Sequence, residues 1–289
     1  MGTFTIYHSL NEAFPGYKEN LASLVREVIE PDGIFLLGAC EHQRRSESIF
    51  CDTAPAASYL SDYFLLILVP RVEGRNPGEL QDKIEQHCRT CMRVITIVIE
   101  TNAFTSWLKT GHRFARRVHH ASVKLYDKGI SYLPLPEDHD AVMEQKDIKK
   151  YFQEGLGKMR EFLVGVDLFR IREQSKMAAF MLHQAAEQGL RTILKTGTGY
   201  YSCTHNLERL LWYASMVSYK LPDIFSAESE KDKQLLKLLQ KAYVGARYNE
   251  DYIIHVAEIN SLVEKITRIQ EILEATGKTY ISAEEHKNV

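Results

Sequence analysis

The chain has 289 residues, which is long enough for two domains of ordinary size. Its 36 basic and 38 acidic side chains give a net charge of −2, which excludes a whole-protein field attracting nucleic acid or an acidic membrane. With 45% hydrophobic and 26% charged residues, the composition is that of a folded protein and excludes global disorder. Any polyanionic partner must therefore be bound by a local patch.

The apolar runs are too short to cross a membrane. The run from Phe64 to Val69 is closed by Pro70, whereas a spanning helix needs about 20 residues. The N-terminus lacks the basic and apolar regions of a secretory signal, and the five cysteines are scattered and odd in number. We therefore expect a cytoplasmic protein with no membrane segment and no disulfide framework.

The first half of the chain alternates helical and strand-like patterns. Apolar residues at helical spacing predict helices over 16–30 and 78–91. Continuous apolar runs predict strands over 34–37, 63–69 and 94–99. Continuous rather than alternating apolarity indicates a sheet that is covered on both faces.

A boundary follows this half. Short apolar runs at 123–126 and 130–133 flank Asp127-Lys128-Gly129 and predict a hairpin, after which two prolines and three carboxylates up to Asp140 mark a linker. Beyond the linker, helices are predicted at about 146–170, 173–195, 205–218, 229–247 and 255–276. Gly277 is expected to close the last of them. The predicted organisation is a first domain over 1–133, a linker over 134–144, a helical domain over 145–276 and a tail over 277–289.

Two segments of the first half carry residues suited to phosphoryl transfer. Each of two predicted strands has such a residue at or beside its end. The first carries a glycine, in Leu36-Leu37-Gly38-Ala39, and the second carries a carboxylate, in Ser61-Asp62-Tyr63-Phe64. This pair resembles the nucleotidyltransferase superfamily, whose members carry a strand, a Gly-Ser turn and an Asp-x-Asp on the next strand. The resemblance implies that the backbone at Gly38 and Ala39 approaches a nucleotide triphosphate while Asp62 holds Mg2+. Because Ala39 and Phe64 replace the serine and the second carboxylate, we expect a degenerate centre.

Three segments of the second half form another pattern, namely Ala178 to Glu187 (AAFMLHQAAE), Thr204 to Leu207 (THNL) and Ala246-Arg247-Tyr248. Together they resemble HEPN domains over about 145–276. The resemblance implies a compact helical bundle, often dimeric, that binds nucleotides or cleaves RNA.

HEPN ribonucleases carry Arg-x4-His at the start of the last helix, where arginine binds phosphate and histidine moves protons. Here Tyr252 stands in the histidine position after Arg247, and a tyrosine, with a reference pKa of about 10, is a poor base at neutral pH. We therefore expect Arg247 and Tyr252 to contact a nucleotide without ribonuclease chemistry. The alternative is that Arg247 merely pairs with Glu187 or Asp251.

Other polar groups have two interpretations each. Arg113, Arg116 and Arg117 share one side of a predicted helix and either line a phosphate groove or are simply solvated. His183 lies within an apolar helix and is interpreted as a packing histidine rather than a ligand. The Cys88-Arg89-Thr90-Cys91 segment lacks a second ligand pair for zinc, so two packing cysteines are expected.

Taken together, these patterns predict an α+β/α fold class, with a nucleotidyltransferase-like mixed α/β domain followed by an all-α HEPN helical bundle. Such pairings resemble toxin–antitoxin systems. The predicted function is nucleotide or RNA binding by a homodimer formed through the HEPN domain. One alternative is an active metal-dependent nucleotidyltransferase in which Glu41, Glu47 or Asp52 replaces the missing carboxylates; another is a non-catalytic dimerisation module.

Overall fold

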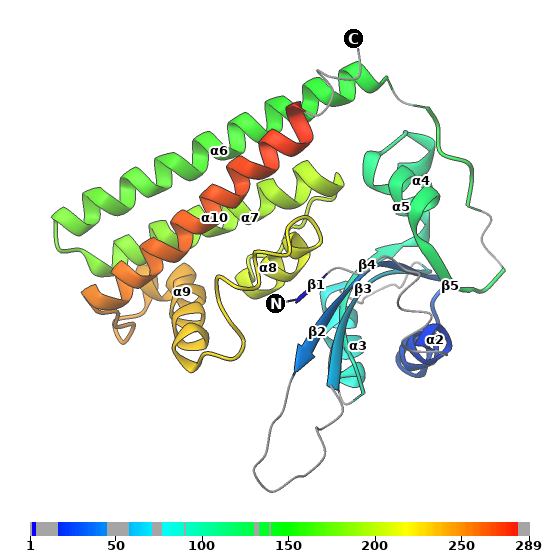
Figure 1. Ribbon diagram of the computed structural model, residues 1–289, viewed down its shortest axis with the longest axis horizontal. Coiled ribbons are helices and arrows are strands. Elements are labelled where there is room, and N and C mark those ends of the chain that lie inside the picture. Colours follow the sequence, from blue (N-terminus) through cyan, green and yellow to red (C-terminus); the bar gives the residue numbers. More distant parts are fainter. Residues whose placement is uncertain are drawn as a thin grey trace, which may run out of the picture. The chain divides into compact units, whose positions relative to one another are not determined.

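The computed structural model describes residues 2–3, 17–44, 58–70, 77–89, 91–129, 133–138 and 140–282 (Figure 1). The chain divides into two compact units, 1–138 and 139–289. The first contains a mixed sheet with helices and the second is helical, as the sequence predicts. Within the ranges just given, none of the helices combines the length and the apolarity that crossing a bilayer requires.

The sheet of the first unit is built on a long antiparallel pair. Its strands are β1 (Gly2–Thr3), β2 (Gly33–Arg44), β3 (Ser58–Val69), β4 (Arg93–Glu100) and β5 (Val123–Asp127). β2 pairs antiparallel with β1, β3 and β5, while β3 pairs parallel with β4. The three predicted strands are confirmed. β5 pairs with β2, and the hairpin predicted between 123–126 and 130–133 stays untested because residues 130–132 lie outside the described residues.

Helices cover this sheet on both faces, as continuous apolarity predicts. They are α2 (Tyr17–Val28), α3 (Pro77–Cys88), α4 (Thr101–Lys109) and α5 (Arg113–Ala121). α3 is the crossover that a parallel β3–β4 pair requires, and it packs with α2 on one face through Leu21, Val25 and Ile84. On the other face Phe104 of α4 is fully buried, with its ring 6.4 Å from that of Phe35.

The two cysteines at the end of α3 differ in environment. Cys88 is fully buried in the core, and burial raises the pKa of its thiol to about 11. Cys91 is exposed, so the expectation of two packing cysteines holds only for Cys88. Both are free thiols.

The second unit contains the five predicted helices: α6 (Ala141–Ile171), α7 (Ser175–Thr198), α8 (Leu207–Ser215), α9 (Glu230–Tyr248) and α10 (Val256–Ser282). α6, α7 and α10 run alongside one another (Figure 1). Two predicted boundaries are corrected. α6 begins at 141, because the side chain of Asp140 accepts hydrogen bonds from the backbone of Val142 and Met143. α10 continues through Gly277, where a Cβ would come within 2.2 Å of the Phe152 ring, so this glycine permits close helix packing rather than ending the helix.

Candidate functional site

The glycine predicted to turn around a triphosphate lies inside a strand. Gly38 pairs with Phe64 across the β2–β3 ladder, next to a register shift between Leu36 and Gly38, and Ala39 pairs with Tyr63. Ala39 is buried in the core between the sheet and its helices. The family's turn is therefore absent at Gly38-Ala39, because β2 continues to Arg44, and nucleotide binding by these two residues stays a prediction.

Asp62 lies at the start of the parallel ladder, where its register partner on β4 is Arg93. Its side chain is buried, and Oδ1 lies 3.8 Å from Nε of Arg93. Phe64, two residues further on the same face, is buried as well. A guanidinium group therefore stands beside the single carboxylate that the motif retains.

The described residues do not fit a Mg2+ site. Magnesium prefers several oxygen ligands in octahedral geometry, and within the described part of the chain no group of three His, Cys, Asp or Glu side chains is arranged to hold a metal ion. Glu100 pairs in register with Val69, at the other end of the β3–β4 ladder from Asp62. At the rise per residue of a strand, the backbones of Glu100 and Asp62 are about 20 Å apart. Glu47 and Asp52 lie outside the described residues, as does the side chain of Glu41.

The three arginines of α5 do not share one exposed face. Arg117 is exposed, whereas Arg113 and Arg116 are half-buried and Nε of Arg116 is fully covered. α5 buries Phe114 and Val118 against the sheet. Phosphate binding by these arginines remains a prediction.

Arg247 is the last basic residue of α9, and its guanidinium group is held in place. Nε and Nη2 donate to the backbone carbonyl of Tyr243, at 2.9 and 2.6 Å. Its Cζ atom lies 4.9 Å from the ring centres of Phe180, Tyr243 and Tyr248. The side chain is exposed and makes no ion pair among the described residues, so the predicted pairing with Glu187 or Asp251 is absent there.

Tyr252 is not available to a ligand. Its side chain is buried against Gly245, and its hydroxyl donates to the carbonyl of Leu238 at 3.1 Å. Burial raises the pKa of the phenol far above its ordinary value. This corrects the prediction that Tyr252 contacts a nucleotide. The Arg247–Tyr252 segment also lies at the end of α9 rather than at the start of the last helix.

A buried carboxylate organises the surface beside Arg247. Glu187 of α7 accepts from Nη1 of Arg191 at 2.6 Å and lies 3.0 Å from Nδ1 of His205. The ring of His205 stacks on Tyr243 with centroids 4.8 Å apart, and half of its side chain is exposed. Glu187 therefore holds in place both the largely buried guanidinium group of Arg191 and the half-exposed imidazole of His205.

His183 lies one helical turn before Glu187 and is fully buried. Its Nδ1 is 3.3 Å from the amide nitrogen of Gln184, while its Nε2 has no hydrogen-bond partner among the described residues. Burial, together with the charges of His205 and Arg191, lowers the pKa of His183 from 6.5 to about 4. The packing role predicted for His183 is confirmed, although half of its hydrogen-bonding capacity is unused.

These contacts continue into a line of cations and rings that we call the cation–aromatic row. Arg191 lies 5.7 Å from the ring centre of Tyr201, and Nζ of Lys195 lies 5.7 Å from the same ring and 4.0 Å from that of Tyr151. The row consists of Arg247, Tyr243, His205, Arg191, Tyr201, Lys195 and Tyr151. Arg191 and Lys195 follow one stripe of α7 at i, i+4 spacing. Along the row, the basic side chains of Arg247, Arg191 and Lys195 therefore lie next to aromatic rings.

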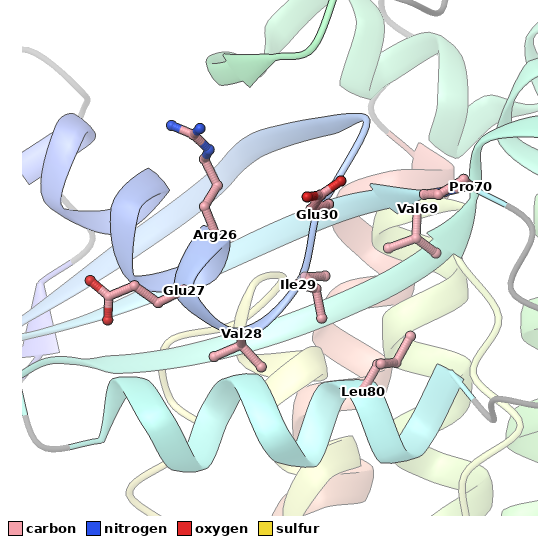
Figure 2. Close-up of a pocket in the computed structure, with 8 residues that line it drawn as sticks. All are labelled: Arg26, Glu27, Val28, Ile29, Glu30, Val69, Pro70 and Leu80. Carbon is pink, nitrogen blue, oxygen red and sulfur yellow. The ribbon is translucent and has the colours of Figure 1, made fainter.

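The first unit has an apolar hollow of about 430 Å³ (Figure 2). It is lined by Arg26, Glu27, Val28, Ile29, Glu30, Val69, Pro70 and Leu80. Figure 2 shows the aliphatic side chains converging while Arg26 and Glu27 point away from them. Arg26 lies over the ring of Tyr126, and Glu27 pairs with His87 at 2.8 Å. This hollow therefore lacks a convergent set of polar groups.

Comparison with known proteins matches the HEPN domain family to residues 160–276. That range runs from α6 into α10 and contains Arg191, His205 and Arg247. No curated protein matches the sequence. Among solved structures, the chain is similar to a nucleotidyltransferase-like protein from Exiguobacterium sibiricum 255-15, with 12% identity and a TM-score of 0.30 over 94% of this chain and 77% of that chain. A TM-score this low does not establish a shared fold. The family match and the helical architecture together identify the second unit as a HEPN domain.

Proposed function

We propose that the HEPN unit binds a nucleotide or an RNA strand through its phosphates, along the cation–aromatic row. The observation that carries this proposal is the Arg247 guanidinium, which is exposed, held by the Tyr243 carbonyl and surrounded by rings rather than by carboxylates. Arginine beside aromatic rings suits a single strand, because the cation binds phosphate while bases stack on the rings. Tyr248 is 75% exposed and offers such a ring.

We further propose that the first unit is a degenerate, nucleotidyltransferase-like domain that transfers no nucleotide. Asp62 stands beside Arg93 rather than beside a second carboxylate, and the Gly38 segment is extended rather than turned. Phosphoryl transfer by this superfamily's chemistry requires metal-holding carboxylates. Incubation with labelled ATP, Mg2+ or Mn2+ and the protein should therefore give no metal-dependent label transfer, and transfer abolished by Asp62→Asn would establish the enzymatic alternative.

The Arg247→Met variant should weaken RNA binding and flatten its dependence on salt. One lost phosphate contact on a single strand reduces the slope of log affinity against log salt by about 0.7. The measurement is fluorescence anisotropy of a labelled oligouridylate across a salt series. Arg268→Met is the matched control, because Arg268 is an exposed arginine on α10 outside the row. Equal slopes for wild type and Arg247→Met would contradict the proposal.

Self-association of the HEPN unit is a second proposal, supported by exposed apolar side chains. Ile171 at the end of α6 is 82% exposed, and Ile253 and Val256 are exposed just before or at the start of α10. Arg170 and Asn260 hydrogen bond at 2.9 Å and join these two regions. Clustered exposed apolar groups mark interaction sites, and the commonest homo-oligomer is a two-fold dimer.

We expect Ile171→Glu to shift the protein from dimer to monomer, because it places a charge where apolar surface would be buried. Light scattering coupled to size-exclusion chromatography gives the mass directly. Val244→Glu on α9 serves as the control, since Val244 is exposed but lies outside that cluster. A wild-type monomer, or a dimer that Ile171→Glu leaves intact, would refute an interface at this site.

A further inference from the structure

The first unit contains a second cavity, distinct from the hollow of Figure 2. Its volume is about 290 Å³, and it lies between the β2–β5 edge of the sheet and helices α4 and α5. Its apolar walls come from Phe35, Leu68, Phe104, Val118 and Leu133. A cavity of this size suits a small organic ligand, since ligand sites are mostly apolar pockets of roughly this volume or larger with a few polar groups.

One carboxylate in this cavity is not neutralised. Oδ2 of Asp32 accepts a 2.6 Å hydrogen bond from Thr101, while no cation pairs with Asp32 among the described residues. Thr101 is buried and fixes the carboxylate in place. An anionic group kept at the wall of an apolar cavity without a counter-ion favours a cationic occupant.

The remaining polar groups that the structure describes around the cavity leave this charge uncompensated. Lys124 and Asp127 pair with each other at 2.7 Å, and this hydrogen bond keeps the pKa of Asp127 below its ordinary value. Burial lowers the pKa of His119, and the charges of His120 and Lys124 lower it further, so the imidazole is neutral near pH 7. Nδ1 of His119 is buried and has no hydrogen-bond partner among the described residues. Counted over the described lining residues, the cavity therefore carries one net negative charge and an unused imidazole nitrogen.

We propose that this cavity is a binding site for a small organic monocation, with an ammonium or amidinium head and a compact apolar or aromatic body. The head pairs with Asp32 and donates to His119, and the body packs against the apolar wall that Phe35 and Phe104 form. An amidinium head carries N–H donors on two nitrogens, so one head can donate to a carboxylate and to an imidazole nitrogen. Nothing in this proposal depends on the row in the HEPN unit.

The test measures binding of benzamidine to the full chain by calorimetry, with benzoate and benzyl alcohol as anionic and neutral probes of similar size. We expect benzamidine to bind at least about tenfold more tightly than either, as a charge-assisted hydrogen bond to a carboxylate implies. Asp32→Asn keeps the shape and the acceptor for Thr101 but removes the charge, and it should weaken benzamidine binding by about tenfold or more. Asp147→Asn, which changes an exposed carboxylate on α6, should leave the binding unchanged.

A second measurement makes the result independent of how well Asp32→Asn folds. Nuclear Overhauser effects from the benzamidine ring to the Leu68 and Leu133 methyl groups of the wild-type protein are expected if the ligand occupies this cavity. Three results would overturn the proposal: similar affinity for all three probes, benzamidine binding that Asp32→Asn does not change, or ring contacts only to other methyl groups. Loss of RNA binding in Arg247→Met would bear on the HEPN unit alone.

Discussion

Replacing Arg191 by methionine should lower the free energy of unfolding by about 3 kcal/mol, since removing one partner of a buried ion pair strands the other charge. The pair in question is short and enclosed: Nη1 of Arg191 lies 2.6 Å from Glu187, and the side chains are 12% and 7% exposed. Arg191 also donates to the backbone carbonyls of Cys203 and Thr204 and so fixes the segment before α8. His205 still contacts Glu187 in the variant, which places the loss at the lower end of the range for buried pairs.

Urea denaturation at neutral pH measures this loss. Arg160→Met is the matched control, because Arg160 pairs with Glu274 at 2.9 Å but the two side chains are 56% and 38% exposed, and solvent-exposed pairs are worth less than about 1 kcal/mol. The double variant Glu187→Gln with Arg191→Met removes the stranded charge and should recover part of the stability. Equal losses in Arg191→Met and Arg160→Met would contradict the buried-pair account.

Hydrophobic periodicity predicted most of the elements, because each depends on its own apolar spacing. It did not predict the ends of elements that are set by strand pairing or by contacts between helices. β2 runs on through Glu41 to Arg44, a polar stretch that has no strand-like apolar pattern and is held by its antiparallel partner β3. α4 was not anticipated, because its short apolar stripe begins directly after β4. The sequence predicts a helix end at Gly277, because it does not show the Phe152 ring that lies against this glycine in the fold.

The resemblance to a family motif singles out particular residues, but it does not show whether each side chain is buried or exposed. Arg247 was singled out by resemblance, and the structure places it on the surface among rings. Tyr252 occupies the histidine position of the same motif yet is buried, because the chain after α9 turns inward onto Gly245.

The other members of the cation–aromatic row come from α6, α7, the segment before α8 and α9, so their proximity follows from tertiary packing. One signal was present in the sequence. Glu187, Arg191 and Lys195 recur at i, i+4 spacing and therefore share a face of α7. The contact between His205 and Glu187 has no such local pattern in the sequence, because Glu187 lies on α7, well before His205 in the chain.

The buried His183 should make the stability of the protein depend strongly on pH. Its pKa falls from 6.5 to about 4 in the folded chain, chiefly through burial, so between these values the unfolded chain binds a proton that the folded chain does not. The stabilisation is complete above pH 6.5 and is lost progressively as the pH falls toward 4. Arg191, Arg247 and His205 place positive charge near the ring and oppose its protonation, while Glu187 lies 3.8 Å from Nδ1.

We therefore expect this residue alone to lower the free energy of unfolding by about 2 kcal/mol between pH 7 and pH 5. Urea denaturation of wild type and His183→Gln at several pH values separates this contribution from that of the carboxylates, which both proteins share. His183→Gln lowers stability at neutral pH because it disturbs a packed site, but the gap between the two proteins should narrow as the pH falls. The stability curves would stay parallel if His183 titrated alike in the folded and unfolded chains, and that result would rule out a buried, neutral imidazole beside Glu187.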